Sequence, residues 1–330
     1  MTIKYNNVYL DSVATVVGPY EHAGPLTRRF DRYYTDMYMH EETFENAEVH
    51  LMKESIDILL DKLNKKKKDI NLFIAGDLQN QITSSSFTAK YLKVPFIGIY
   101  AACATNVLGL ILGSNLIDSK KVNNALVAVS SHNMVSERQF RNPTEYGAPK
   151  PETATFTATG GASCYLSNIK GDIKIESSTI GKVIDMEQTD PNDMGAVMAG
   201  AAIDTIYQHL KDLKRKPDYY DLIITGDLGR YGKEIVIDYM QKEYHLDLTK
   251  NYNDCGVMLY DLDSQKEVMA GGSGPVCSAL VFYGDIVPKM KNKELKRVLY
   301  VATGALFSPT SIFQKQNILS IAHAISLEVE

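Results

Sequence analysis

The segments LFIAGDL (residues 72–78) and LIITGDL (residues 222–228) decide the fold of this chain. Each is a short, continuous apolar run that ends in Gly-Asp-Leu, and such runs are typical of strands buried on both faces of a sheet. An amphipathic helix is expected before each of them, over residues 44–63 and around residues 199–213, because apolar residues recur there at helical spacing. The two segments therefore mark two copies of one unit.

The landmarks that follow each segment also recur at matching distances. Cys103 lies 26 residues after Asp77, and Cys255 lies 28 residues after Asp227. A strand-like run then follows in each half, ALVAVSS before residue 132 and VLYVATG before residue 305. Repeats of about 150 residues indicate a domain duplication, since solenoid repeats have periods of about 20–50 residues. We predict two α/β halves, 1–170 and 171–330, packed side by side with helices covering central mixed sheets.

The composition is that of a globular protein. The 330 residues are 45% hydrophobic and 23% charged, with a net charge of −5. This balance argues against a disordered chain and against a nucleic-acid partner, which usually requires a basic stripe. The four cysteines have no CxxC spacing, and no cluster of metal-ligating residues is visible. We expect no metal, no cofactor and a reducing compartment.

Two segments bear on membranes. The longest apolar stretch, Val107–Ile117, has 11 residues, whereas a bilayer span needs about 20, so we expect a buried helix and at most a peripheral membrane association. The basic run Lys65–Lys68 favours a solvated connection between a helix and a strand. Its alternative interpretation is electrostatic attachment to an anionic membrane.

Cys103 is the most suggestive single residue. It stands between an apolar run and the small-residue segment ATNVLGLILGSNLI, which predicts a thiol near a helix N-terminus. Enzymes that transfer acyl groups present a nucleophilic cysteine on such a strand-to-helix turn. A buried cysteine that only fills space is the other interpretation, and the local sequence leaves both open.

A working acyltransferase also needs a base and oxyanion donors beside the thiol. Among the seven histidines, His132 is the best candidate because it directly follows the strand-like run ALVAVSS. The second half contains no HxxN or GHP segment that could supply a partner. This absence weighs against acyl transfer.

Two polar segments are candidates for binding an anion. The connection SSHNMVSERQFRNPTEYG (130–147) carries Glu137, Arg138 and Arg141, and arginine suits the two oxygens of a carboxylate. The alternative is that these arginine and glutamate side chains pair with each other. The segment AGGSGPVCSA (270–279) predicts a glycine-rich turn into a small-residue strand, with backbone N–H groups available to an anion.

Several strings in the chain match a known family. They include SVATVVGP, GPLTRRFD, AGDLQNQITSSSF, SERQFR followed by P-x-EYG, YNDCGVMLYD and VATGALFSPTS, and they run from near the N-terminus to the last residues. On these motifs the chain resembles the stage V sporulation protein AD family of spore-forming bacteria, whose members are similar in fold to thiolases. The resemblance implies a thiolase-like fold with a layered α/β/α/β/α core.

The resemblance also implies a function without catalysis. The family is associated with binding pyridine-2,6-dicarboxylate (dipicolinate) and moving it into the developing spore. Its setting is the inner spore membrane, peripherally, beside integral membrane proteins of the same operon. Whether the ligand is the free acid or its calcium chelate stays open.

The departures from thiolases fit this interpretation. Cys103 falls at the nucleophile position, and Asp227 and the Asn253–Cys255 segment fall where condensing enzymes have His and Asn. A carboxylate beside the thiol would raise the pKa of the thiol. We therefore expect no enzyme activity. The predicted ligand-binding set is Cys103, Ser131, His132, Glu137, Arg138, Arg141, Asp227, Asp254 and Cys255.

Two alternatives remain at this point. The chain could be an active thiolase-like or ketoacyl-synthase-like acyltransferase that uses Cys103 and His132, or a scaffold whose pocket is vestigial. By analogy with the thiolase fold we also expect a homodimer.

Overall fold

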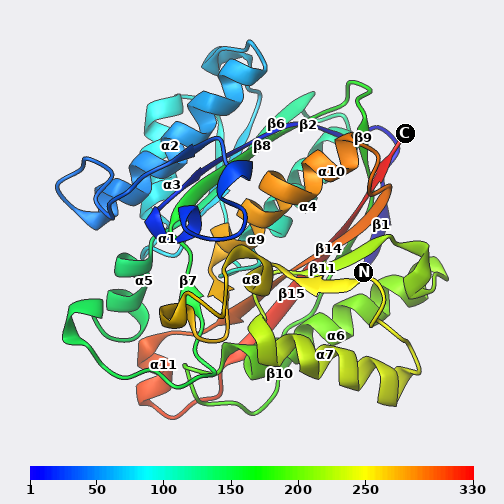
Figure 1. The fold of residues 1–330 in the computed structure, drawn as a ribbon. Helices are drawn as coiled ribbons and strands as arrows, with labels where there is room; N and C mark the ends of the chain where they lie inside the picture. Colours follow the sequence, from blue (N-terminus) through cyan, green and yellow to red (C-terminus); the bar gives the residue numbers. More distant parts are fainter.

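The two halves of the chain share one strand order. The computed structural model describes residues 1–330 and is drawn in Figure 1. In the first half the sheet order is β5-β4-β6-β8-β2, and in the second half it is β12-β11-β14-β15-β9. The fourth strand of each order, β8 or β15, runs antiparallel to both of its neighbours. The predicted duplication is therefore present strand by strand. The bounds of these strands are β2 Tyr9–Val17, β4 Phe73–Gly76, β5 Phe96–Gly98, β6 Asn124–Ser131, β8 Gly160–Ser167, β9 Ile173–Ile180, β11 Leu222–Thr225, β12 Tyr252–Asp254, β14 Arg297–Leu306 and β15 Leu319–Val329.

The two sheets are joined at one edge, and short strands extend them. Tyr9 of β2 pairs with Lys174 of β9, and residues 170 and 171 lie in the turn between β8 and β9. The short strands β1, β3 and β10 pair with β9, β2 and β15, while β7 and β13 form a separate parallel pair that links the halves beside the pocket described below. Their bounds are β1 Thr2–Lys4, β3 Arg32–Tyr33, β7 Phe156–Thr157, β10 Ile184–Asp185 and β13 Gly272–Ser273.

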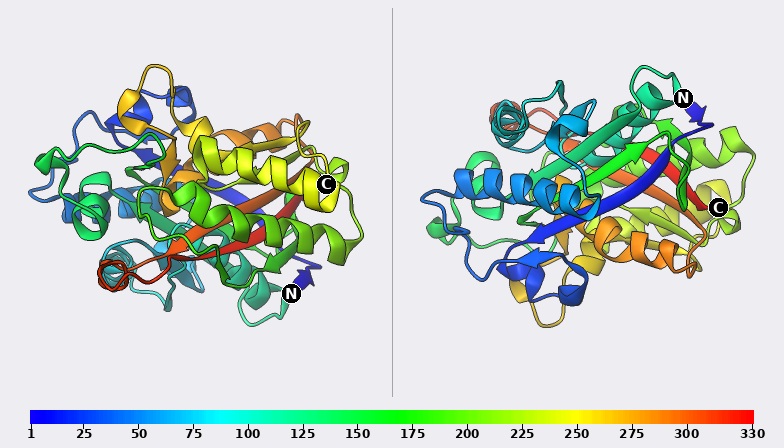
Figure 2. Two further views of the ribbon diagram at one scale, coloured as in Figure 1. Left: turned by 90° about the horizontal axis from the view of Figure 1, so that it is seen from below. Right: turned by 90° about the horizontal axis from the view of Figure 1, so that it is seen from above.

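Helices form three layers around the two sheets. The helices α2 and α3 cover the outer face of the first sheet, and α6 and α7 cover that of the second, so that Figure 2 shows them on opposite sides of the molecule. Between the sheets lie α4, which packs against strands of both halves, and a helix that runs from α9 into α10. The predicted α/β/α/β/α layering is confirmed. The helices are α1 Pro19–His22, α2 Phe44–Lys62, α3 Thr83–Leu92, α4 Thr105–Asp118, α5 Asn133–Phe140, α6 Met194–Leu213, α7 Gly229–Tyr244, α8 Cys255–Leu259, α9 Pro275–Val281, α10 Val287–Lys291 and α11 Pro309–Phe313.

Local sequence explains where the helices begin and how closely they pack. The side chains of Thr43 and Asp193 accept hydrogen bonds from N–H groups in the first turns of α2 and α6. In α4, a Cβ atom on Gly109 would lie 2.6 Å from a methyl carbon of Val127 in β6. Glycine therefore lets α4 approach the sheet closely. The largest cluster of buried apolar residues, 44 of them, occupies this middle region, which makes it the main core.

Two local expectations were wrong. Residues 133–140, predicted as part of a connection, form α5, and residues 275–281, predicted as a strand, form α9. A short run of small apolar residues fits a buried helix as well as a strand, and Pro275 occupies the first turn of α9, where proline is favoured. The two short helices approach the pocket described next. No helix in the structure has both the length and the apolar character required to cross a membrane.

Candidate functional site

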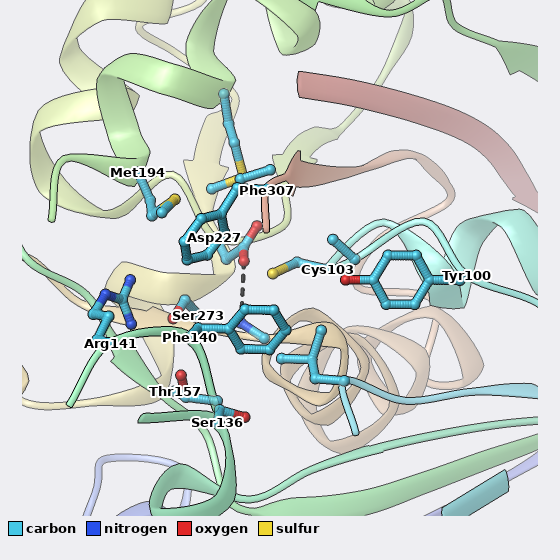
Figure 3. Close-up of a pocket in the computed structure, with 15 residues that line it drawn as sticks. Tyr100, Cys103, Ser136, Phe140, Arg141, Thr157, Met194, Asp227, Ser273 and Phe307 are labelled. Carbon is cyan, nitrogen blue, oxygen red and sulfur yellow. Dashed lines mark hydrogen bonds between the residues drawn. The ribbon is translucent and has the colours of Figure 1, made fainter. Parts of the chain in front are cut away.

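A pocket lies between the two halves, at the carboxyl ends of the parallel strands and beside the first residues of α4 and α9 (Figure 3). Its empty volume is about 470 Å³, including the part open to solvent. Most of its lining is apolar. The lining residues are Leu78, Tyr100, Ala102, Cys103, Ser136, Phe140, Arg141, Thr157, Met194, Met198, Asp227, Ser273, Gly274, Ala305 and Phe307.

Cys103 lies on the turn between β5 and α4, as the sequence predicted. The turn is tight, because Ala102 adopts a φ of 48° in the left-handed region, which a non-glycine residue seldom adopts. The thiol lies beside the carboxyl group of Asp227 from the second half. Burial, reinforced by this carboxylate, raises the pKa of the Cys103 thiol well above its usual range. The expected effect of the helix terminus on the thiol is therefore overridden.

Asp227 is held by donors from its own half. Its Oδ1 accepts the hydroxyl of Thr303 at 2.7 Å, and its Oδ2 accepts the backbone N–H of Gly274 at 3.1 Å. Burial raises the pKa of Asp227 to about 7, and repulsion from Asp254 adds to the effect. At neutral pH the pocket therefore contains a carboxyl group that readily exchanges a proton.

Arg141 supplies the positive charge of the pocket. Its Nε donates to the carbonyl of Pro191 at 3.0 Å, and its Nη1 donates to Glu137 at 3.0 Å. Its Nη2 makes no hydrogen bond within the chain. Glu137 is buried and also forms an ion pair with Lys150 at 3.0 Å. The guanidinium is thus fixed on two sides and free to bind a ligand on the third.

The remaining residues of the predicted set do not line the pocket. Arg138 is half exposed and forms an ion pair with Glu45 on the surface. The pairing within residues 130–147 that the sequence left open is the ion pair of Arg141 with Glu137. The hydroxyl of Ser131 donates to the carbonyl of Ala158 at 2.7 Å.

His132 is also placed away from the pocket. Its ring is fully buried, and its Nε2 donates to the carbonyl of Met37 at 2.8 Å. Burial lowers the pKa of His132 to about 4. The sequence placed this histidine at the correct strand end but could not show which way its side chain points.

Asp254 and Cys255 lie behind the pocket wall. Asp254 accepts hydrogen bonds from the hydroxyl of Thr225 and from the backbone N–H groups of Leu228, Gly229 and Gly256, at 2.7 to 3.0 Å. It therefore holds together the starts of α7 and α8. Cys255 is fully buried.

Sequence reasoning missed several lining residues. The hydroxyl of Ser136 is buried in the pocket wall and has no hydrogen-bond partner. The rings of Phe140 and Phe307 lie 5.2 Å apart and, with Tyr100, form an aromatic wall. Phe140 belongs to a segment that had been selected for its arginines, and no signal in the sequence pointed to Phe307. No group of three or more His, Cys, Asp or Glu side chains in the structure is arranged to hold a metal ion.

Comparison with known proteins identifies the family. The family described as stage V sporulation protein AD matches residues 1–328. The stage V sporulation protein AD of Bacillus subtilis (strain 168) is 46% identical over 321 residues, which cover 97% of this chain and 94% of that protein. The chain belongs to the stage V sporulation protein AD family. The resemblance seen in the sequence is confirmed.

Solved structures similar to this family member include a 3-oxoacyl-[acyl-carrier-protein] synthase III and an OleA variant. The 3-oxoacyl-[acyl-carrier-protein] synthase III of Aquifex aeolicus VF5 aligns with a TM-score of 0.56 at 13% identity, and an OleA variant of Xanthomonas campestris with a TM-score of 0.62 at 13% identity. Each alignment covers 99% of both chains. At this identity the likeness shows the fold alone, which is thiolase-like.

Proposed function

We propose that this chain binds dipicolinate, without chemical conversion, in the pocket between its halves, and that it serves dipicolinate uptake into the developing spore. The observation that carries the proposal is Arg141, which lines a largely apolar pocket and whose Nη2 makes no hydrogen bond within the chain. A charged donor in such surroundings binds a carboxylate strongly, because little water competes for it.

The other walls of the pocket suit a flat aromatic acid. The buried hydroxyl of Ser136 lacks a partner, and it gives a second donor. Phe140 and Phe307 offer ring surfaces against which an aromatic ligand can pack. Asp227 opposes a dianion only while it is ionised, and its pKa of about 7 lets it take up a proton when the ligand binds.

The proposed function includes no catalytic step, for two reasons: the Cys103 thiol is protonated, and the His132 side chain lies away from the pocket. A nucleophilic cysteine requires a thiolate, and the pKa of Cys103 is raised well above its usual range by burial and by Asp227. His132, the candidate base, bonds to the carbonyl of Met37 away from the pocket.

The second candidate is an acyltransferase that uses Cys103. Its support is the position of Cys103 on a tight strand-to-helix turn with φ 48° at Ala102, a placement that presents nucleophiles in other enzymes. Transfer of an acyl group from acyl-CoA to Cys103 would establish this candidate and refute the binding proposal in its non-enzymatic form.

We further propose a peripheral location at the inner spore membrane, with integral membrane proteins of the same operon as partners, and a homodimer. The edge strand β5 supports the homodimer, because β5 pairs only with β4 and its residues Ile97 and Gly98 are exposed. An unpaired edge of this kind is a template for pairing with a second copy. Sedimentation of the protein as a monomer would refute the homodimer.

Calorimetric titration with dipicolinate, with and without calcium, tests the main proposal. We expect saturable binding that Arg141→Ala weakens by about 1.5–3 kcal/mol, as for a hydrogen bond to a charged group. Arg138→Ala is the matched control, because Arg138 pairs with Glu45 outside the pocket. The proposal would be overturned if dipicolinate bound neither with nor without calcium. It would also be overturned if Arg141→Ala and Arg138→Ala weakened binding equally.

A further inference from the structure

Eight lysines gather at the end of the molecule opposite the pocket. They are Lys65–Lys68 between α2 and β4, Lys120 and Lys121 between α4 and β6, and Lys291 and Lys293 at the end of α10. Each of these connections leads into the start of a parallel strand, whereas pocket residues such as Leu78 and Asp227 follow the ends of such strands. In Figure 1, α5 and α11, which flank the pocket, lie at the lower left, away from the far ends of α2 and α10. We call this set of eight lysines the lysine rim.

The three parts of the lysine rim form one surface. The first two connections are tied together, because the N–H of Asn71 donates to the side chain of Asn124 at 2.9 Å and the N–H of Asn123 donates to the side chain of Asn71 at 3.0 Å. The end of α10 joins them at Asp11 of β2. Lys291 donates to the carbonyl of Asp11 at 3.4 Å, and Lys65 and Lys291 both lie near the Asp11 carboxylate.

The positive charge of the lysine rim is only partly offset within the chain, by the Asp11 carboxylate near Lys65 and Lys291. None of the eight ammonium groups has a carboxylate within 4.0 Å, the limit for an ion pair. Lys65 and Lys67 lie over the rings of Tyr165 and Tyr91, which hold the ammonium groups in place without cancelling their charge. Besides Asp11, four carboxylates stand in or beside these segments, and two of them accept backbone N–H groups, Asp69 from Lys66 and Asp118 from Asn6. The other two are Asp61 and Glu294. Because the whole chain carries a net charge of −5, the rim is a local exception to an acidic surface.

We infer that the lysine rim docks the protein on the headgroups of an anionic lipid bilayer. An apolar side chain beside the rim supports this inference: Ile169, in the turn between β8 and β9, is 67% exposed and available to the bilayer. That turn is fixed to the rim, because the N–H of Asn168 donates to the carbonyl of Asn123 at 3.1 Å. Lysines around an exposed aliphatic side chain suit the interface of an anionic membrane.

A lipid surface fits the rim better than a nucleic acid does. The three connections, residues 63–72, 119–123 and 292–296, contain no arginine, the residue that usually binds phosphate and base edges by two hydrogen bonds. The two tyrosines nearest to the lysines are already covered by Lys65 and Lys67, so they are not free to stack with bases.

Docking through the rim leaves the mouth of the pocket facing away from the membrane. The inference concerns a different surface from the ligand site and does not depend on the proposed ligand.

Sedimentation with lipid vesicles tests the inference on the full chain. We expect binding to phosphatidylcholine vesicles that contain phosphatidylglycerol, weakening as the salt concentration rises, and no binding to phosphatidylcholine alone. The variant Lys66→Glu/Lys120→Glu should bind at least about 25-fold more weakly, since each lysine near an anionic surface contributes a factor of about five. Ile169→Ser should weaken binding by an amount that salt does not change.

The matched control is Lys266→Glu/Lys315→Glu, which makes the same change of charge at exposed lysines near the pocket end. It should bind anionic vesicles like the unmodified chain, and circular dichroism melting should show that both double variants are folded. Three results would overturn the inference: no binding to anionic vesicles, equal loss in both double variants, or tighter binding of a single-stranded oligonucleotide than of the vesicles.

Discussion

Arg141 and Glu137 stand one helical turn apart at the end of α5 and form an ion pair of 3.0 Å in which both side chains are largely withdrawn from water. Arg138 and Glu45 form a second ion pair close by in sequence, but both side chains are 40% exposed or more. Two neighbouring arginines thus have different environments, and only Arg141 lines the pocket.

The buried pair should contribute much more to stability than the exposed pair. We expect Glu137→Gln to lower the free energy of unfolding by about 3 kcal/mol, because it leaves Arg141 and Lys150 without their common partner. Glu45→Gln should lower it by less than about 1 kcal/mol. Denaturant unfolding of the two variants measures this difference, and equal losses would contradict it.

Dipicolinate binding should strengthen as pH falls from about 8 to about 6. The pKa of Asp227 is about 7, so lowering the pH removes a negative charge that faces a dianionic ligand. The gain is at most about tenfold per pH unit, the limit for uptake of one proton. Calorimetric titrations at several pH values measure it, and Asp227→Asn should bind with no such dependence. Stronger binding at pH 8 than at pH 6 would refute this role of Asp227.

Cys103 should react slowly with iodoacetamide at neutral pH. Its pKa is raised by burial and by the Asp227 carboxylate, and the thiolate is the reacting species. Asp227→Asn should speed the alkylation, because it removes the like charge. Mass spectrometry of the labelled peptide measures the rate, and the buried Cys255 serves as an unreactive internal reference. Fast labelling of Cys103 in the unmodified chain would contradict the prediction.

Stability should increase as pH falls from about 8.5 to about 6.5. Burial raises the pKa of Glu21 and Asp227 to about 7 and that of Glu48 to about 8. In the folded state these carboxyl groups therefore take up protons in a range where the same groups of the unfolded chain stay ionised. Stability held by such groups is lost as pH rises through these pKa values.

The gain in stability should level off below pH about 6.5, because this is the ordinary pKa of histidine. The pKa values of His132 and His323 are lowered to about 4 and that of His209 to about 3, so the unfolded chain then takes up protons that the folded chain excludes. Unfolding curves across this pH range test both trends. Glu48→Gln should flatten the alkaline part of the profile, and a stability that rises between pH 6.5 and 8.5 would contradict the prediction.

The sequence alone determined the fold and the family. The pattern of the segments 72–78 and 222–228 predicted two duplicated α/β halves, because the periodicity of apolar residues indicates burial. The thiolase-like layering was expected from the resemblance to the family. Rare strings such as SERQFR identified the family across the whole chain. Cys103 was placed on its turn correctly for the same reason: its position depends on the local order of strand and helix.

Only the tertiary structure decided which side chains meet. The sequence could not separate Arg141 from Arg138, and it could not show that His132 points to Met37 or that Asp254 lies behind the pocket wall and binds backbone N–H groups. Nor could it predict Phe307 beside Phe140, since this pair joins residues more than 100 positions apart. Asp227 beside Cys103 was expected only through the resemblance to the family. The physical reason is that local patterns fix the period and burial of an element, whereas the direction of one polar side chain depends on the partners that packing brings to it.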